Sequence, residues 1–342
     1  MVTIEKFGET SKGEDVYALT LKDGAGNSAV FLNYGATMQS FNVALSRGRQ
    51  RDICLGYDTI KEYEENNGCF GGTIGRCVNR IVPPEVTIDG KLYHLDENRP
   101  NMHIHGGSNG FHQKIWSAER DGNIAVFRLT SADGENGYPG ALTVEVKIWF
   151  AEAGLLEMQY DAYADHATII NLTNHSYFNL DGHNAGDARL QKLSILSTEY
   201  ATIKNGIPDG NRATVFNSPM NFVDGRTIYS ESKPPLDTNG YDLCYLLKGR
   251  GIQRVATITA QDETISMDVY ADFPAIQFYD GWGISPRAGK NGAVYTANSG
   301  ICLEPEYVPN AVHIAAFEKP IFSANTHFRH TIRYCLRSKC RE

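Results

Sequence analysis

The sequence predicts an all-β protein, built as a large antiparallel β-sandwich with few short helices. Apolar and polar residues alternate with a period of two along most of the 342 residues, which is typical of strands with one buried face. Turn-forming clusters of Gly, Asn and Asp separate these stretches at short intervals. Helical periodicity is sparse, and strands with short spacers over the whole length favour a large antiparallel sandwich or a barrel-like β fold.

The strands are expected in three series along the chain. The first is a hairpin, with residues 86–88 and 91–93 flanking Asp89-Gly90, because Asp-Gly supplies the positive φ angles of a type I′ turn. The second series comprises residues 124–130, 142–150 and 155–163, and turn-forming segments at 133–137 and 152–154 separate its strands. The third comprises residues 255–259, 264–270 and 275–279. Within the second series, residues 142–148 alternate strictly, so we expect one buried and one exposed face there.

Other features are few. One short helix is predicted at residues 58–64, with Asp58 as its N-cap. Lys233-Pro234-Pro235 is expected to be a stiff loop, but the composition on its two sides is alike. Because no repeat or linker divides the chain, we expect residues 1–342 to form a single domain.

Composition excludes several classes of function. Asp and Glu outnumber Lys and Arg by 40 to 32, a net charge of −8 that repels phosphate backbones, so no nucleic-acid partner is expected. No apolar run of 18 residues and no signal peptide occur, so no membrane association is expected. The seven cysteines share no CxxC spacing and are expected to be reduced thiols in a cytoplasmic protein.

Glycine and histidine motifs point away from nucleotide chemistry. The segment 71–76 (GGTIGR) lacks the Lys-Ser/Thr of a phosphate loop, and no GxGxxG occurs, so no nucleotide cofactor is expected. His103 and His105 could share one strand face and bind a metal, but no third ligand accompanies them. The alternative is that His105, followed by two glycines, is a rigid imidazole where a ligand approaches the backbone.

Three polar segments are candidates for a binding or catalytic site. Asn174-His175-Ser176-Tyr177-Phe178-Asn179 mixes amides, an imidazole and aromatic rings, as sugar sites do, although His175 could instead be an ordinary turn residue. Glu304 ends an apolar run that would raise its pKa towards that of a useful base, unless it points to water at a strand end. Arg80 beside Asn79 could hold a diol, although an exposed arginine is the ordinary alternative.

In combination, these segments resemble the aldose 1-epimerase (galactose mutarotase) family. The matching stretches occur in the family's order from about residue 70 to 310: residues 74–81 (IGRCVNRI), 105–107 (HGG), 174–180 (NHSYFNL), 240–242 (GYD), 277–279 (QFY) and 302–305 (CLEP). The resemblance implies a β-sandwich of the galactose mutarotase type that interconverts the α and β anomers of free aldohexoses, such as galactose and glucose. It also implies that the reaction needs no cofactor and no metal.

The resemblance also implies residue roles. Glu304 would be the general base and His175 the general acid, and the substrate ligands would be Asn79, Arg80, His105, Tyr177, Asp242 and Gln277. The chemistry asks for these types independently. Opening a hemiacetal ring removes a proton from the C1 hydroxyl and gives one to the ring oxygen, which an ionised carboxylate and a protonated imidazole can do together.

Alternatives remain at this point. One alternative is a hexose-6-phosphate 1-epimerase on the same fold, which would need an added cationic residue for the phosphate, and Arg287 is the candidate. The other is a non-catalytic sugar-binding or regulatory module, which would keep the pocket without turnover. Two departures from the family pattern, His103-Ile104 and Tyr279-Asp280-Gly281-Trp282, put local packing and substrate preference in question, and the latter segment is expected to border the cleft. We expect a monomer or weak dimer.

Overall fold

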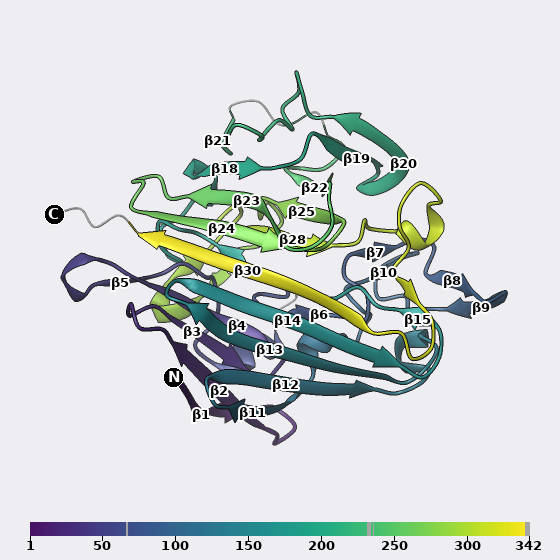
Figure 1. The fold of residues 1–342 in the computed structure, drawn as a ribbon, viewed down its shortest axis with the longest axis horizontal. Helices are drawn as coiled ribbons and strands as arrows, with labels where there is room; N and C mark the ends of the chain where they lie inside the picture. The colour runs from purple at the N-terminus through teal and green to yellow at the C-terminus, as the bar shows by residue number, and fades with distance from the viewer. Residues whose placement is uncertain (66–67, 231–233, 235, 339–342) are drawn as a thin grey trace.

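The computed structural model describes residues 1–65, 68–230, 234 and 236–338, and its regular structure is almost entirely β (Figure 1). The largest sheet has nine antiparallel strands. In spatial order they are β11 (Ser117–Asp121), β12 (Ile124–Ser131), β13 (Leu142–Glu152), β14 (Leu155–Ala164), β30 (Phe328–Ser338), β24 (Ile265–Ala271), β23 (Gln253–Thr259), β18 (Lys192–Ile195) and β21 (Arg226–Thr227).

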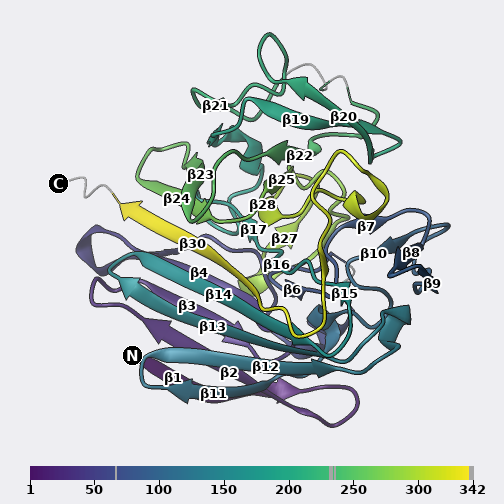
Figure 2. The same ribbon diagram turned by 45° about the vertical axis from the view of Figure 1, so that its right-hand side comes forward.

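Two smaller sheets lie opposite the large one. The five-stranded sheet contains β1 (Val2–Glu9), β2 (Asp15–Lys22), β3 (Ser28–Leu32), β4 (Thr37–Ala44) and β5 (Gln50–Asp52). The six-stranded sheet contains β17 (Tyr177–Phe178), β28 (Ile301–Glu306), β25 (Ala275–Tyr279), β22 (Asp242–Leu246), β19 (Glu199–Lys204) and β20 (Ile207–Thr214). The first lies across from β12–β14 and the second across from β23 and β24 (Figure 2).

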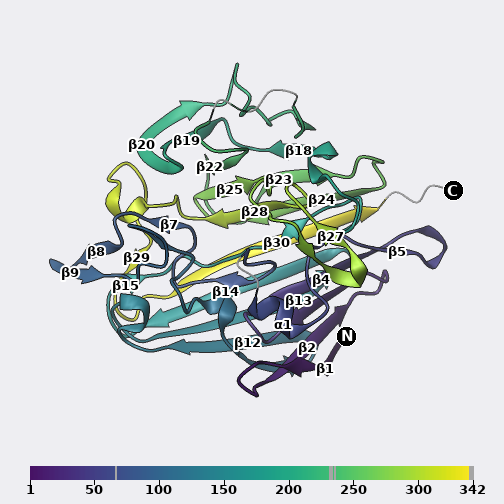
Figure 3. The ribbon, with the colours of Figure 1, turned by 180° about the vertical axis from the view of Figure 1, so that it is seen from behind.

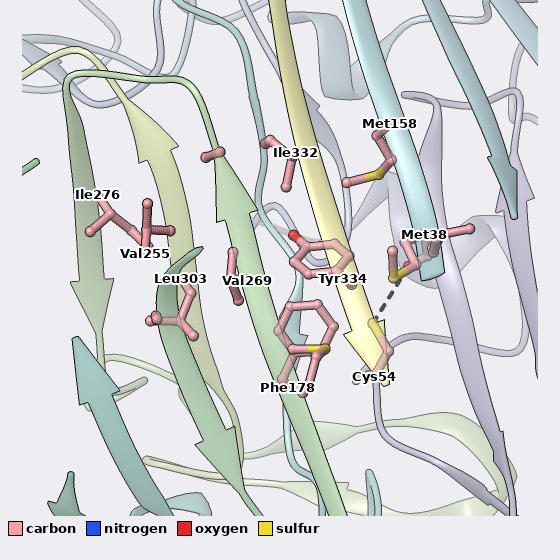
Figure 4. Packing of buried hydrophobic residues seen from close by; sticks show 14 of the residues in the cluster. Met38, Cys54, Met158, Phe178, Val255, Val269, Ile276, Leu303, Ile332 and Tyr334 are labelled. Atoms are coloured by element: carbon pink, nitrogen blue, oxygen red, sulfur yellow. Dashed lines mark hydrogen bonds between the residues drawn. The ribbon is translucent and has the colours of Figure 1, made fainter. Parts of the chain in front are cut away.

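One apolar core fills the space between these sheets. Met158, Ile332 and Tyr334 extend from the large sheet, and Phe178 and Leu303 approach from the six-stranded sheet (Figure 4). All five are buried to about 1% exposure or less, so the core excludes water along its length. The antiparallel sandwich predicted from the period of two is therefore confirmed.

Short paired strands and turns lie outside these three sheets, several of them along one side of the molecule (Figure 3). The pairs are β6 (Thr73–Ile74) with β16 (Thr173–Asn174), β7 (Arg80–Ile81) with β10 (His103–Ile104), β8 (Glu85–Ile88) with β9 (Lys91–His94), β15 (Thr168–Ile169) with β29 (Ile321–Phe322), and β26 (Arg287–Ala288) with β27 (Val294–Tyr295). The 3-10 turns are Ser46–Gly48, Phe111–Gln113, Glu135–Gly137, Ala188–Leu190, Lys290–Gly292 and Ala311–His313.

Most predicted strands are present with nearly the expected bounds. In the β8–β9 hairpin, Asp89 and Gly90 have φ angles of 50° and 78°, as a type I′ turn requires. The first seven residues of β13 alternate between buried and more exposed positions, as predicted from residues 142–148.

The predicted helix is present but its cap was wrong. Helix α1 spans Ile60–Glu64, and Thr59 is the N-cap instead of Asp58, because the Thr59 side chain and Glu62 form a reciprocal capping box. The stiff loop predicted at Lys233-Pro234-Pro235 lies outside the described residues except for Pro234. Within the described part of the chain, no helix is long and apolar enough to cross a membrane.

Candidate active site

A pocket of about 320 Å³ opens beside the six-stranded sheet, and seven of the eight predicted site residues line it. Its size and mixed polar and aromatic lining suit a small polar ligand. The seven residues are Asn79, Arg80, His105, His175, Tyr177, Asp242 and Glu304. The eighth, Gln277, lies one hydrogen bond behind the wall, where its amide donates to Asp242 Oδ1 at 2.5 Å.

Strand pairing brings these distant residues together. Glu304 of β28 pairs with Gln277 of β25. On the other side of β25, Asp242 of β22 pairs with Tyr279. Three adjacent strands therefore form one wall of the pocket. His175 follows β16 directly, and its main-chain N–H donates to Gly72 O. The carboxylates and the imidazole are therefore positioned by sheet hydrogen bonds rather than by a long loop.

His175 and Glu304 form the centre of the pocket. His175 Nε2 lies 3.6 Å from Glu304 Oε2, and His175 Nδ1 lies 3.5 Å from Cys302 Sγ. The imidazole stacks on the Tyr177 ring, with centroids 5.1 Å apart and planes inclined by 20°. Because both ring nitrogens and one ring face are in contact with protein, the imidazole has a defined orientation.

Burial shifts the titration of this pair in opposite directions. It lowers the pKa of His175 to about 4, and burial together with the Asp242 charge raises the pKa of Glu304 well above its usual value. Burial therefore favours the neutral form of each side chain, a protonated carboxyl at Glu304 and a neutral imidazole at His175. This differs from the protonated imidazole expected from the sequence, although the two arrangements contain the same number of protons.

Arg80 and Asp242 form a second cluster in the pocket wall. Arg80 Nη2 donates to Asp242 Oδ2 at 2.8 Å, and Arg80 Nη1 donates to Asn79 Oδ1 at 3.0 Å. Both side chains are largely buried, so the charge-assisted bond is little screened by water. This geometry argues against the alternative that Arg80 is an ordinary exposed arginine.

His105 is held by backbone contacts at the pocket. Its φ angle is 52°, and the main-chain N–H of Asn79 donates to its Nδ1 at 3.3 Å, which leaves the hydrogen on Nε2. At the next position a Cβ would lie 1.8 Å from Gly75 O, so only glycine fits at Gly106. These contacts match the prediction of a rigid imidazole close to backbone.

The two histidines of the HxH pattern have different partners. His103 Nδ1 contacts Asp96 O at 2.7 Å and its Nε2 contacts the Tyr138 hydroxyl at 2.5 Å, so neither ring nitrogen is directed to a site shared with His105. This arrangement opposes the metal-binding interpretation. Among the described residues, the one group of three potential metal ligands is instead His175, Cys302 and Glu304, whose ligand atoms lie within 4.8 Å of one another.

Several residues of the pocket wall were not predicted as site residues. They are Cys69, Phe70, Arg99, Ile104, Ile284 and Ser285, together with glycines 68 and 283. Apart from Ile104, which ends the two-residue strand β10, they lie outside the helices and strands, where no periodic signal marks them, so only the folded chain brings them to the pocket. Tyr279 and Trp282 line it too, as expected for a segment bordering the cleft, and so does Arg287.

Comparisons with known proteins agree on one family. The family model described as aldose 1-epimerase matches residues 17–335. The chain is 32% identical over 315 residues to aldose 1-epimerase of Escherichia coli (strain K12), covering 90% of this chain and 91% of that protein. It is 34% identical over 306 residues to galactose mutarotase of Homo sapiens, covering 88% of each.

Solved structures show the same fold. An aldose epimerase homologue from C. elegans superposes with a TM-score of 0.86 at 23% identity, covering 94% of this chain and 98% of that chain. Galactose 1-epimerase from Lactobacillus acidophilus superposes with a TM-score of 0.83 at 24% identity, covering 99% of each.

Proposed function

The chain belongs to the aldose 1-epimerase family and is an aldose 1-epimerase, an isomerase, and we propose that Glu304 and His175 carry out its proton transfers. The observation that carries this assignment is the 3.6 Å separation of His175 Nε2 and Glu304 Oε2 inside the pocket. The two oxygens that exchange protons during ring opening are bonded to the same carbon, C1. A base and an acid this close together can therefore contact both oxygens of one bound sugar.

In the proposed reaction, sugar binding places Glu304 as the carboxylate and His175 as the imidazolium. Glu304 takes the proton of the C1 hydroxyl while His175 gives its proton to the ring oxygen, and the C1–O5 bond breaks to form the open-chain aldehyde. The pair is then a neutral acid and a neutral imidazole, which is the arrangement that burial favours for both groups. After rotation about C1–C2, the reverse transfers close the ring on the other face.

The remaining residues would bind the sugar. Arg80 and Asp242 are proposed to hold ring hydroxyls, since their paired charges present both donors and acceptors to the pocket. The Nε2–H of His105 would donate to a further oxygen, and the Tyr177 ring would support His175. Asn79 is proposed to contact sugar beside Arg80. Gln277 is kept as a proposed ligand that also orients Asp242.

Free galactose and glucose are the proposed substrates, and no cofactor or metal is proposed to take part. A second candidate is a hexose 6-phosphate, which is favoured by Arg99 and Arg287 in the pocket wall. The guanidinium of Arg287 already lies over the Phe70 ring and donates to the Tyr57 hydroxyl at 3.3 Å, which makes it less available to a phosphate. We therefore place the neutral sugars first.

Polarimetry of freshly dissolved α-galactose, α-glucose and α-glucose 6-phosphate tests the proposal. The rate with the neutral sugars should exceed that with the phosphate, and His175→Asn should lower the galactose rate at least about a hundredfold. A faster reaction with the phosphate would reverse the assignment of substrate class. Unchanged relaxation with folded wild-type protein would favour the non-catalytic sugar-binding module.

We also propose a single domain over residues 1–342 that works as a monomer or weak dimer, because one chain supplies the whole pocket. Analytical ultracentrifugation tests the oligomeric state. A cytoplasmic location is proposed from the free thiols of six cysteines among the described residues, which suit a reducing compartment. Fractionation of the source cells tests it.

A further inference from the structure

Glu306 is a second buried glutamate next to the proposed catalytic base. It lies two residues after Glu304 in β28, so both side chains extend from the same face of the strand. Glu306 is fully buried and is not among the residues that line the pocket, so it does not reach the sugar itself. The proposed proton transfers leave this residue without a role.

The main contact of Glu306 is with Asn79. Asn79 Nδ2 donates to Glu306 Oε1 at 3.2 Å, while Asn79 Oδ1 accepts from both the main-chain N–H and Nη1 of Arg80, each at 3.0 Å. A carboxamide has its donor on one side and its acceptor on the other. An acceptor at Glu306 therefore determines that the amide oxygen, and not the amino group, is turned towards Arg80.

Glu306 is an unfavourable residue for this buried position. Its Oε2 has no hydrogen-bond partner among the described residues, although it is buried. An unpaired buried polar atom lowers stability because it has lost its hydrogen bonds to water, and an apolar side chain here would avoid that loss. Cys244 and Ala275 belong to the apolar cluster beside this strand, so the surroundings would accept such a side chain. Buried polar residues without a full set of hydrogen-bond partners are often functional.

The charges around Glu306 favour a neutral carboxyl. Glu304 is on the same strand, Asp242 and Cys244 are on β22, Cys77 lies before β7 and Arg80 on β7 is the one cation among these neighbours. Burial and the nearby Glu304 charge raise the pKa of Glu306 well above its usual value. A neutral carboxyl accepts from Asn79 without adding a charge beside the base, and glutamine would do the same.

We propose that Glu306 is a positioning residue that, through Asn79, orients the Arg80 guanidinium for sugar binding. The inference rests on the proposed function of the pocket, because it assumes that Arg80 holds a ring hydroxyl. Glu306 would thus affect the affinity for sugar and not the proton transfers. Its carboxyl oxygen, not its charge, is the feature that matters.

A pair of matched variants tests the proposal. Glu306→Leu removes the acceptor and should raise KM for galactose about fivefold, the equivalent of one hydrogen bond, with kcat changed less than about twofold. Glu306→Gln keeps an acceptor and should restore KM to within about twofold of wild type. Wild-type KM in the leucine variant, or an equal loss in both variants, would overturn the proposal.

A double-mutant cycle with Asn79→Ala tests the route. Asn79→Ala should itself raise KM, and adding Glu306→Leu to it should cause little further change, because the intermediary is already gone. Additive effects, or a wild-type KM in Asn79→Ala, would overturn the proposal even if Glu306→Leu folds poorly. Calorimetric titration of the variants with galactose already at anomeric equilibrium measures affinity independently of the turnover rate, so an error in the proton-transfer assignment would not alter this result.

Discussion

Replacing Glu304 by glutamine is the most direct test of the proposed base. Glutamine has nearly the same shape but cannot accept the proton of the C1 hydroxyl, and the pairing of β28 with β25 through Gln277 is unaffected by the change. A positioned general base contributes about 10²- to 10⁴-fold, which corresponds to about 2.7–5.4 kcal/mol of transition-state stabilisation. We therefore expect kcat for α-galactose to fall at least about a hundredfold.

The same substitution has a predictable effect on stability. The pKa of Glu304 is higher in the folded protein than its usual value, so between these two values the folded state binds more protons than the unfolded state. The contribution of this carboxyl to stability therefore falls as the pH rises through that range. Glutamine does not titrate, so Glu304→Gln does not lose stability as the pH rises. The melting temperature of the variant should match or exceed that of wild type at pH 8, and the difference between the two proteins should be smaller at pH 5.

Polarimetry gives the rate and thermal denaturation gives the stability. Glu157→Gln is a matched control, because Glu157 is also largely buried but lies on β14, where it pairs with Arg333 at 2.7 Å on the other face of the large sheet. The control should keep its rate. Activity of Glu304→Gln within about tenfold of wild type would refute the assignment of the base, and a lower melting temperature at pH 8 would refute the linkage argument.

The remaining predictions concern the proton pair, the sugar ligands and the pocket wall. The pH profile of kcat/KM should be bell-shaped. Its acid limb should lie near pH 4, below which His175 and Glu304 are both protonated, and its alkaline limb should lie where the pair loses its one proton. A flat profile between pH 3 and 6 would contradict this prediction. Asp242→Asn should raise KM at least about tenfold and have a smaller effect on kcat, because Arg80 loses its ionic partner. Steady-state kinetics measures both constants, and an unchanged KM would contradict the prediction. Arg76→Leu should lower the free energy of unfolding, measured by urea titration, by about 3 kcal/mol or more. The buried guanidinium donates to several main-chain carbonyls, which would lose their partner in this variant. A loss below about 1 kcal/mol would be inconsistent with that role.

Local patterns predicted the strands well because a period of two survives wherever one sheet face is buried. The Asp89-Gly90 turn is such a case, since its geometry depends only on two residues. The helix cap was misassigned because Asp58 and Thr59 are both good caps, and the reciprocal contact of Thr59 with Glu62 decided between them. That choice depends on one side-chain pair, which periodicity does not resolve.

The site was predictable in part for a different reason. Family resemblance supplied Glu304 and His175, which the structure brings into one pocket, but their residue types alone left ordinary alternatives open. The distribution of the proton between them depends on burial, which no local pattern reports. Glu306 was likewise missed, because its significance depends on a contact with Asn79 across 227 positions of sequence.

The place of β30 in the large sheet has a consequence for biosynthesis. This late strand (Phe328–Ser338) lies between β14 and β24, and so joins two halves of the sheet that are made much earlier. Until it emerges from the ribosome, β14 and β24 each present an open edge to other nascent chains. Premature termination before residue 328 should therefore give aggregates rather than a smaller working enzyme.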